Sequence, residues 1–272
     1  MISDHQKRIA TGLTLLACLV TAIALEGWAA RLLVLAASSL ALWEFLSMYW
    51  PGGMYLGRKV FGLAMGAAIV LAQIFGPHWT AVAVVLGFFA VSLAFLFDFG
   101  RGNAEARFGH YGPLIHGMVY IPLVLQLVLH LKPSEQCMVM LAAMAADTGG
   151  FYAGKYFGKR KIWPLVSPKK TWAGFFGGIA LCVLVCGLQG FLGKTMGWSL
   201  PALPVWIWAC LGLVFCLSAQ LGDFFESALK RSLSVKDSSA LLPGHGGVLD
   251  RIDSVLFVLP VYYLIRMLTA VA

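Results

Sequence analysis

The sequence contains few charged residues. Only 12% of its 272 residues are Asp, Glu, Lys or Arg, whereas 60% are hydrophobic, and the mean hydropathy is +0.83. A soluble domain carries about 25% charged and about 45–50% apolar residues. The composition therefore excludes an ordinary soluble globular domain and predicts an integral membrane protein.

Acidic residues are scarcer than basic ones. The chain has 12 Asp and Glu against 20 Lys and Arg, a formal net charge of +8. In a soluble protein this excess would suggest a nucleic-acid partner, but in a membrane protein it is typical of basic loops that face anionic lipids. We therefore predict a lipid bilayer as the environment and no nucleic-acid partner.

Metal-binding cysteine pairs and internal repeats are also missing from the sequence. The six cysteines lie in or beside apolar stretches, and none has the C-x-x-C spacing of a zinc or redox site. We find no repeat, low-complexity tract or soluble domain. The sequence thus predicts a single integral-membrane domain over residues 1–272, with its most informative region at 220–253.

Long hydrophobic runs are what the sequence has in abundance. A membrane-spanning helix takes about 20 mostly apolar residues. The fold class that we predict is all-α, a polytopic transmembrane helix bundle of about nine spans. The first run follows Lys7 and Arg8 like a signal peptide, but we favour an uncleaved segment, and a full span and a shallow hairpin with the second run both stay open. The expected spans are 9–25, 30–48, 60–76, 79–97, 114–131, 137–154, 173–192, 205–225 and 253–271.

The distribution of Lys and Arg sets the orientation of these spans. With the N-terminus in the cytoplasm, 16 of the 20 cationic residues fall in cytoplasmic loops and 4 on the far side. Cytoplasmic loops of membrane proteins carry such an excess of Lys and Arg. The N-terminus is therefore predicted to be cytoplasmic, and the polar loops 155–172 and 226–252 are predicted to share that side.

Carboxylates cluster at both ends of the second of these loops. Asp223, Glu226, Ser227 and Lys230 follow the spacing i, i+3, i+4 and i+7, which places them on one helix face. Asp250 begins a similar i, i+3 pair with Asp253 at the start of the last span. A carboxylate in a spanning helix costs about 2.5–3.5 kcal/mol unless it faces a polar cavity or a partner. Hard oxygen ligands at this density favour a divalent ion such as Mg2+.

Between these carboxylates lie groups suited to phosphate binding. Lys230, Arg231 and Lys236 come first, and the stretch Pro243-Gly244-His245-Gly246-Gly247 follows them. Glycines let backbone N–H groups approach phosphate oxygens, and the start of the next helix adds positive potential. Carboxylates, metal, cationic side chains and a glycine loop together indicate phosphoryl or nucleotidyl transfer.

A second group of polar residues precedes this region. Asp147-Thr148-Gly149-Gly150 lies within an apolar span, and Ser167-Pro168-Lys169-Lys170-Thr171 follows in the next cytoplasmic loop. An ordinary basic loop would explain the lysines, but topology alone does not require Asp147. We interpret the two stretches as a second part of the same site.

The residues from Ser227 to Asp253 resemble the signature of the phosphatidate cytidylyltransferases. The matching pieces are Ser227, Lys230-Arg231, Lys236-Asp237, Pro243-Gly244-His245-Gly246-Gly247 and Asp250-Arg251-Ile252-Asp253. The resemblance implies a Mg2+-dependent enzyme that transfers CMP from CTP to phosphatidic acid, giving CDP-diacylglycerol and pyrophosphate. It also implies a homodimer in the bacterial cytoplasmic (inner) membrane, with its active site facing the cytoplasm.

The resemblance implies the metal ligands, and the chemistry of the side chains suggests the other roles. Asp223 and Asp250 would ligate the metal, and a second cation is left open. The catalytic group would be Asp223, Lys230, Asp250, Arg251 and Asp253. The substrate-binding group would be Asp147, Ser167, Lys169, Lys170, Thr171, Ser227, Arg231, Lys236, Asp237, His245, Gly246 and Gly247.

Two other functions are considered. A related membrane lipid kinase or nucleotidyltransferase, such as a polyprenol kinase, would use a similar site. A transporter would place charges near the bilayer midplane within inverted repeats, whereas here the charges cluster at one face. Glu44 in the second span stays open between a functional carboxylate and an interfacial one.

Overall fold

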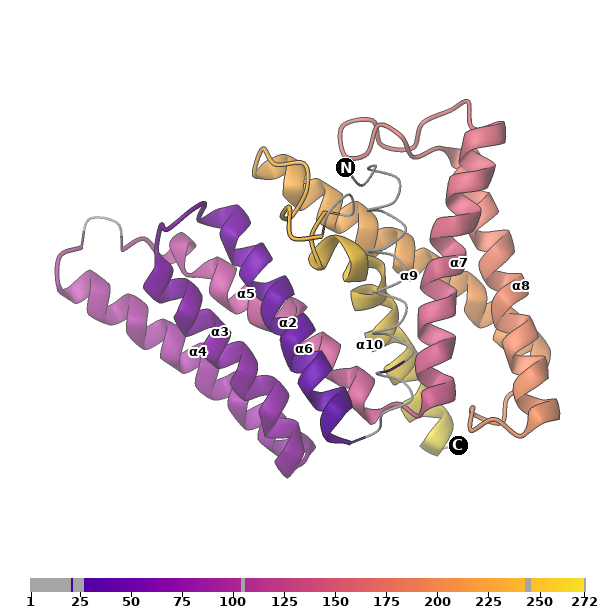
Figure 1. Ribbon diagram of the computed structural model, residues 1–272, viewed down its shortest axis with the longest axis horizontal. Helices are drawn as coiled ribbons and strands as arrows, with labels where there is room; N and C mark the ends of the chain where they lie inside the picture. The colour runs from indigo at the N-terminus through magenta and orange to yellow at the C-terminus, as the bar shows by residue number, and fades with distance from the viewer. Residues whose placement is uncertain (1–20, 22–26, 104–105, 243–245, 272) are drawn as a thin grey trace, which may run out of the picture. The chain divides into compact units, whose positions relative to one another are not determined.

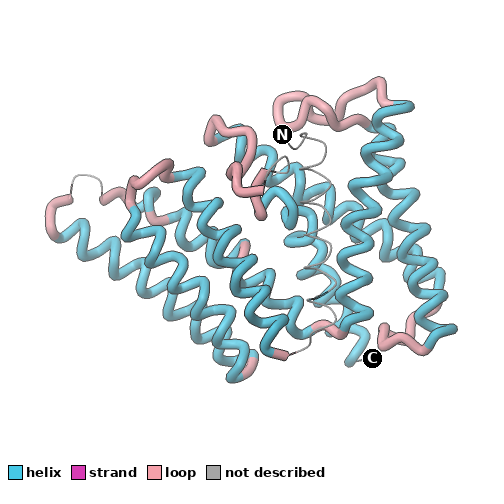
Figure 2. The backbone as a smooth tube through the Cα atoms, in the orientation of Figure 1, coloured by secondary structure: helices cyan, strands magenta, loops and turns pink. Residues whose placement is uncertain are grey.

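A computed structural model of the chain describes residues 21, 27–103, 106–242 and 246–271. The predicted first span, 9–25, lies almost entirely outside these residues. Every regular element in the described ranges is a helix (Figures 1 and 2), which confirms the all-α fold class. The chain forms two compact units, Met1–Leu129 with Asp237–Asp250 (unit 1), and His130–Lys236 with Arg251–Ala272 (unit 2).

Unit 1 contains three long helices and a broken fourth. These are α2 (Trp28–Tyr49), α3 (Leu56–Ala72), α4 (Pro77–Gly100) and α5 (Gly112–Tyr120). Three short helices accompany them, η1 (Gln73–Phe75), η2 (Phe108–His110) and α6 (Pro122–Leu125), and η3 (Gln126–His130) leads out of the unit. The predicted span 114–131 is broken because Pro122 has no N–H to donate and its ring crowds the preceding turn.

The core of unit 1 lies along α2. Helix α3 lies between α2 and α4 (Figure 1), and Leu42 of α2 is 1% exposed. A Cβ atom added at Gly66 of α3 or at Gly117 of α5 would lie 2.7 Å from the Leu42 side chain. These two positions require glycine because two neighbouring helices approach the same leucine.

Unit 2 contains α7 (Pro133–Phe157), α8 (Trp172–Met196), α9 (Val205–Ser232) and most of α10 (Leu249–Val271). Helix α8 packs against both α7 and α9. A Cβ atom added at Gly149 of α7 would lie 2.5 Å from the Gly177 carbonyl oxygen of α8. Small residues at such positions let membrane helices approach closely. Phe225 of α9 meets Phe257 of α10, with 5.6 Å between ring centroids.

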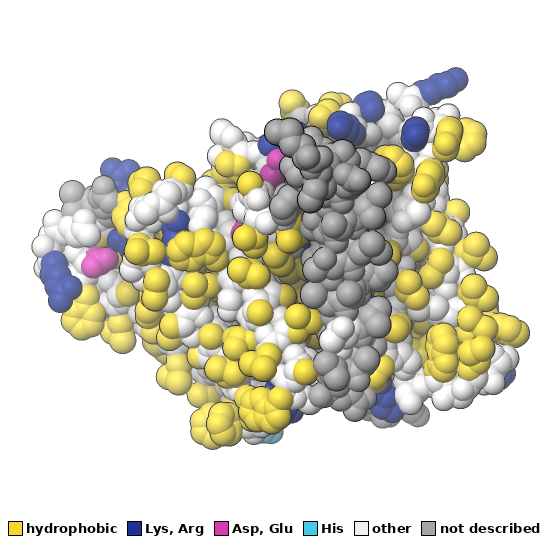
Figure 3. Space-filling model, viewed as in Figure 1, with side chains coloured by type: hydrophobic (Ala, Val, Ile, Leu, Met, Phe, Trp, Pro, Cys, Tyr) yellow, Lys and Arg dark blue, Asp and Glu magenta, His cyan; other side chains and the backbone are white. Residues whose placement is uncertain are grey.

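The described helices confirm a polytopic membrane protein. Seven of them are long and apolar enough to cross a membrane, and hydrophobic side chains cover much of the visible helical surface (Figure 3). Helix α7, which carries Glu135, Asp147 and Lys155, is not among the seven. Each predicted span after the first falls on a described helical segment, but the count of nine is not confirmed.

Candidate active site

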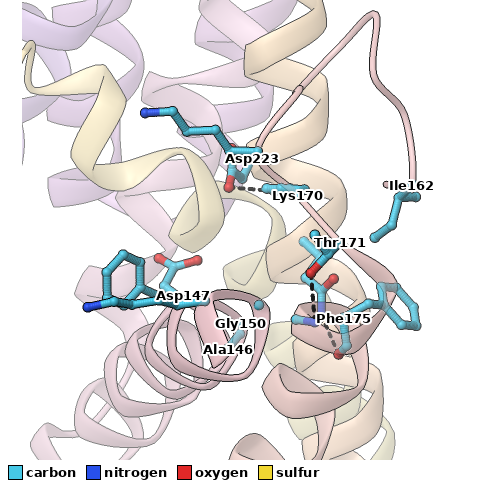
Figure 4. Close-up of a pocket in the computed structure, with 14 residues that line it drawn as sticks. Ala146, Asp147, Gly150, Ile162, Lys170, Thr171, Phe175 and Asp223 are labelled. Carbon is cyan, nitrogen blue, oxygen red and sulfur yellow. Dashed lines mark hydrogen bonds and ion pairs between the residues drawn. The ribbon is translucent and has the colours of Figure 1, made fainter. Parts of the chain in front are cut away.

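A cavity of about 390 Å³ opens in unit 2 between α7, the α7–α8 loop, α8 and α9 (Figure 4). Its charged lining residues are Asp147, Lys155, Lys169, Lys170 and Asp223. Members of the predicted second group of polar residues, Asp147, Lys169 and Lys170 among them, therefore line one cavity together with Asp223 of the region 220–253. The cavity brings anionic and cationic side chains from separate helices to one place.

The α7–α8 loop is folded against the cavity by its own backbone. Lys161 and Thr171 form an antiparallel bridge, and the Ile162 N–H donates to the Lys170 carbonyl oxygen at 3.2 Å. The Thr171 hydroxyl oxygen accepts from the Gly174 N–H at 3.2 Å and caps α8. A threonine at this position satisfies a donor that the helix itself leaves without a partner. Lys169 and Lys170 are therefore held on a closed loop, over which Lys and Arg side chains gather in Figure 3.

Lys170 and Asp223 form the central ion pair of the cavity (Figure 4). The Lys170 Nζ lies 2.5 Å from the Asp223 Oδ2, and it also lies 4.0 Å from the centre of the Phe224 ring. The Ser227 hydroxyl donates to the Asp223 Oδ1 at 3.3 Å. The helix face predicted from the spacing of these residues is thus formed.

Further carboxylates lie beside this pair in unit 2. Glu226 is 0% exposed, and its Oε1 lies 3.4 Å from the Lys230 Nζ. The Asp253 side chain lies close enough to Glu226 for the two carboxyl groups to interact. Asp147 is within electrostatic range of Asp223, Asp253, Lys170 and Arg251. Glu226 was placed on the right helix face by sequence, but was not proposed as a site residue.

The glycine loop and Asp250 belong to unit 1. Asp250 lies in the first turn of α10, and its Oδ2 accepts from the Ser238 N–H, the Ser238 hydroxyl and the Gly247 N–H at 3.0, 2.8 and 2.8 Å. Gly246 has a φ of +79°, which favours glycine. Asp237 begins this stretch, and His245 lies outside the described residues.

Glu44 of α2 is the residue that sequence reasoning left open. It is 2% exposed and accepts hydrogen bonds from Ser238, Ser239, Val248 and Leu249. Its position within an apolar span was the signal that could have found it, because such a carboxylate needs polar partners. These partners come from the region around the glycine loop.

The remaining predicted residues lie outside the cavity lining within the described part of the chain. Arg231 is in the last turn of α9, and Lys236 follows that helix. Ser167 lies in the α7–α8 loop, where its N–H donates to the Trp163 carbonyl oxygen at 2.9 Å. The structure leaves the binding roles of these three residues as predictions.

The carboxylates also bear on metal binding. Among the described residues, no group of three or more His, Cys, Asp or Glu side chains is arranged to hold a metal ion. The donor chemistry nevertheless fits a hard cation, since Asp223 offers carboxylate oxygens and already receives the Lys170 ammonium at 2.5 Å. Asp223 is therefore a suitable ligand by its chemistry.

Comparison with known proteins gives a consistent result. A model of the cytidylyltransferase family matches residues 6–269. A phosphatidate cytidylyltransferase of Bacillus subtilis is 30% identical over 270 residues, which cover 96% of this chain and 97% of that protein. The enzyme of the same name from Staphylococcus epidermidis is 45% identical over 121 residues, and the chain spans 44% of its length. One from Mycobacterium bovis is 46% identical over 120 residues, 44% of this chain and 37% of that protein.

Proposed function

The chain belongs to the cytidylyltransferase family, and we propose that it transfers CMP from CTP to phosphatidic acid, giving CDP-diacylglycerol and pyrophosphate. The observation that carries this proposal is the cavity of unit 2. There Lys169 and Lys170, from one closed loop, line the same space as Asp147 and Asp223 from two helices. Such a mixture suits a polyphosphate substrate, whose charge needs cationic partners.

The proposed reaction is a displacement at the α-phosphorus of CTP. A phosphate oxygen of phosphatidic acid forms a bond to that phosphorus, and the bond from the phosphorus to the oxygen bridging the β-phosphorus breaks. Pyrophosphate leaves with that bridging oxygen. A phosphate monoester is largely ionised near neutral pH, so no general base is required to remove a proton. Stabilisation of charge on the transferred group is the larger requirement.

Cationic side chains supply part of that stabilisation. Lys170 is held by Asp223 at the cavity, and Lys169 lines the same space. We propose that both bind the triphosphate, and that Lys230 and Arg251 bind phosphate oxygens of CTP or lipid. Arg231, Lys236, Asp237, His245, Gly246 and Gly247 stay proposed substrate contacts from the sequence signature.

We propose Mg2+ as the cofactor, with Asp223 and Asp250 as ligands and a second cation left open. The support from the structure is the donor chemistry, since Asp223 presents both oxygens to polar or cationic partners. When bound, Mg2+ supplies charge neutralisation at phosphate oxygens. The chain's own part is to present the carboxylates and to hold the phosphates with Lys and Arg.

The proposed setting is the bacterial cytoplasmic (inner) membrane, with the site facing the cytoplasm and the enzyme acting as a homodimer. The support is the excess of Lys and Arg in the loops that carry the site, and the bacterial origin of the relatives. A site at that face can receive CTP from the cytosol and a lipid phosphate at headgroup level.

The test is pyrophosphate release by the purified protein in detergent, supplied with CTP, phosphatidic acid and Mg2+. We expect release only when all three are present, and a loss of about 100-fold or more in Asp223→Asn. Asp98→Asn is the matched control, because Asp98 pairs with Arg58 at 3.2 Å in unit 1 and lines no part of the cavity. Turnover with ATP or another lipid in place of CTP or phosphatidic acid would instead identify the related lipid kinase or nucleotidyltransferase.

A further inference from the structure

We propose that Glu44 is a positioning residue for the catalytic loop, meaning the described residues of 237–250. The proposal rests on the proposed function, because it assigns to Glu44 the task of holding residues that the reaction uses. Glu44 lies on α2, about 190 residues away from the loop in sequence. It touches the loop, and we assign it no contact with substrate.

The carboxylate of Glu44 is used on both oxygens. Its Oε1 accepts from the Ser239 hydroxyl at 2.6 Å and from the Val248 N–H at 3.0 Å. Its Oε2 accepts from the Ser238 hydroxyl at 3.3 Å and from the Leu249 N–H at 2.8 Å. Oε1 therefore receives one side-chain hydroxyl and one backbone N–H, whereas Oε2 receives one backbone N–H and shares the single Ser238 hydroxyl proton with the Asp250 Oδ2, which lies nearer at 2.8 Å.

These contacts hold both ends of the catalytic loop. Ser238 and Ser239 lie near its beginning, whereas Val248 and Leu249 lie at its end, where α10 starts. Donors at the start of a helix have no partner within the helix, so a carboxylate that accepts from them fixes where the helix begins. Arg251 and Asp253 follow in α10, so their placement depends on that start.

Asp250 and Glu44 share a partner in the loop. The Ser238 hydroxyl lies 2.8 Å from the Asp250 Oδ2 and 3.3 Å from the Glu44 Oε2. Gly247 packs against the same place, since a Cβ atom there would lie 2.0 Å from the Ser238 Oγ and 2.5 Å from the Glu44 Oε2. A larger residue at position 247 would therefore have to displace the Ser238 or the Glu44 side chain.

Burial makes the contacts of Glu44 consequential. Glu44 is 2% exposed and Ser238 is 7% exposed. A buried carboxylate needs hydrogen-bond donors, and the same shielding strengthens each bond that it accepts. We infer that the catalytic loop and Glu44 order each other, and that the segment carrying Asp250 keeps its position through α2.

Glu44→Gln is the diagnostic change because it keeps the shape of the side chain. The amide has one oxygen and one NH2 group, so in either orientation a backbone N–H of Val248 or Leu249 faces a donor. A serine hydroxyl can rotate to accept from the NH2 group, but a backbone N–H cannot. Glu44→Asp keeps two acceptor oxygens and only shortens the side chain.

The experiment measures kcat and KM for CTP in the purified full-length protein, with amide hydrogen exchange at Val248 and Leu249. We expect kcat of Glu44→Gln to fall about 10- to 100-fold, as is usual for residues that orient site groups. Exchange at the two amides should rise while the later turns of α10 stay protected. Glu44→Asp should fall between wild type and Glu44→Gln.

Asp98→Asn is the control for a carboxylate-to-amide change in the same unit, at a side chain that is about one-third exposed. Its carboxylate accepts from Arg58 and Tyr111 and does not touch the catalytic loop. It should leave kcat unchanged. If Glu44→Gln does not fold, Ser239→Ala removes the 2.6 Å contact to Glu44, together with the 3.1 Å bond that the same hydroxyl accepts from the exposed Leu241 N–H, and kcat should then fall about 3- to 10-fold.

The outcomes separate this inference from the proposed function. Active wild type with unchanged kcat in Glu44→Gln, or in Ser239→Ala where Glu44→Gln does not fold, would overturn the role of Glu44 and leave the reaction standing. A loss of kcat without any change in exchange at Val248 and Leu249 would also overturn it. Wild type that is inactive with CTP and phosphatidic acid would overturn the proposed function, and the exchange measurement would still decide whether Glu44 orders the loop.

Discussion

The two units hold their key carboxylates with different kinds of partner. In unit 1, Glu44 and Asp250 accept hydrogen bonds from backbone N–H groups and serine hydroxyls of the catalytic loop. In unit 2, Asp223 pairs with the Lys170 ammonium at the cavity, and Glu226 pairs with Lys230 on the same helix as Asp223. Neutral, fixed donors serve the first pair, and cationic ends of long side chains serve the second.

This difference distinguishes carboxylates that fix the shape of a loop, which we call the frame, from carboxylates that lie at a binding surface. A backbone N–H is fixed by the fold, so a carboxylate that it bonds defines the shape of the loop. A lysine ammonium sits on a flexible stem and can exchange one anionic partner for another. A phosphate that enters the cavity can therefore take over Lys170 from Asp223, which then becomes available to another cation. The predictions that follow test this division.

The largest effect on activity is expected for Asp250→Asn. This substitution should separate the two roles of Asp250, which are to accept the loop hydrogen bonds and to supply negative charge to the proposed metal. Only the Oδ2 of Asp250 accepts the three loop hydrogen bonds, so the asparagine oxygen can replace it and keep the frame. The substitution still removes the negative charge that the proposed metal requires. We expect pyrophosphate release to fall about 100-fold or more.

The accompanying measurement is amide hydrogen exchange at Ser238 and Gly247. Both amides should stay as protected as in wild type, because the asparagine oxygen still accepts from them. Asp250→Ala is the matched control, since it removes charge and acceptor together, and should lose both activity and protection. Near-normal activity in Asp250→Asn would show that Asp250 serves only the frame.

A smaller effect is expected for Lys170→Met, compared with Lys169→Met on the same loop. Lys170 lies 2.5 Å from Asp223 and 4.0 Å from the Phe224 ring centre, and methionine keeps the packing while removing the charge. Loss of a charge-assisted contact to a phosphate should raise KM for CTP about 10-fold. Lys169 lines the cavity but is more exposed, so its change should be about 3-fold. Equal effects would contradict a specific role for the Lys170–Asp223 pair.

Much of the fold could be predicted from hydropathy, because a bilayer imposes length and polarity on each helix. The predicted spans 173–192 and 205–225 fall within α8 and α9. Helix α9 continues to Ser232, since polar residues there can extend a helix beyond the apolar part that hydropathy detects. The interruption near Pro122 depends on local backbone geometry, and a hydropathy profile does not register it.

The candidate site was partly predictable for a related reason. Helical spacing placed Asp223, Ser227 and Lys230 on one face, and the structure confirms that face through the Ser227–Asp223 hydrogen bond and the Lys230–Glu226 ion pair. The role of Glu44 could not be read from the sequence, because no local pattern joins a carboxylate on α2 to a loop about 190 residues later. The second role of Thr171, as the cap of α8, likewise required the structure.

The smallest effect on activity is expected for Arg266→Met. This substitution tests whether every carboxylate in unit 2 that pairs with a cationic side chain takes part in substrate binding. Glu135 is 2% exposed and combines both kinds of partner, since it accepts from the Lys132 N–H at 2.7 Å and pairs with Arg266 at 3.1 Å. Glu135 caps the start of α7, and its pair with Arg266 joins α7 to α10.

Removing the Arg266 guanidinium should lower the free energy of unfolding by about 1–3 kcal/mol and the melting temperature by several degrees. We expect kcat and KM to stay at wild-type values at a temperature where both proteins are folded. A changed KM for CTP would show that the pairing of a carboxylate with a cation, wherever it occurs in unit 2, bears on the substrate.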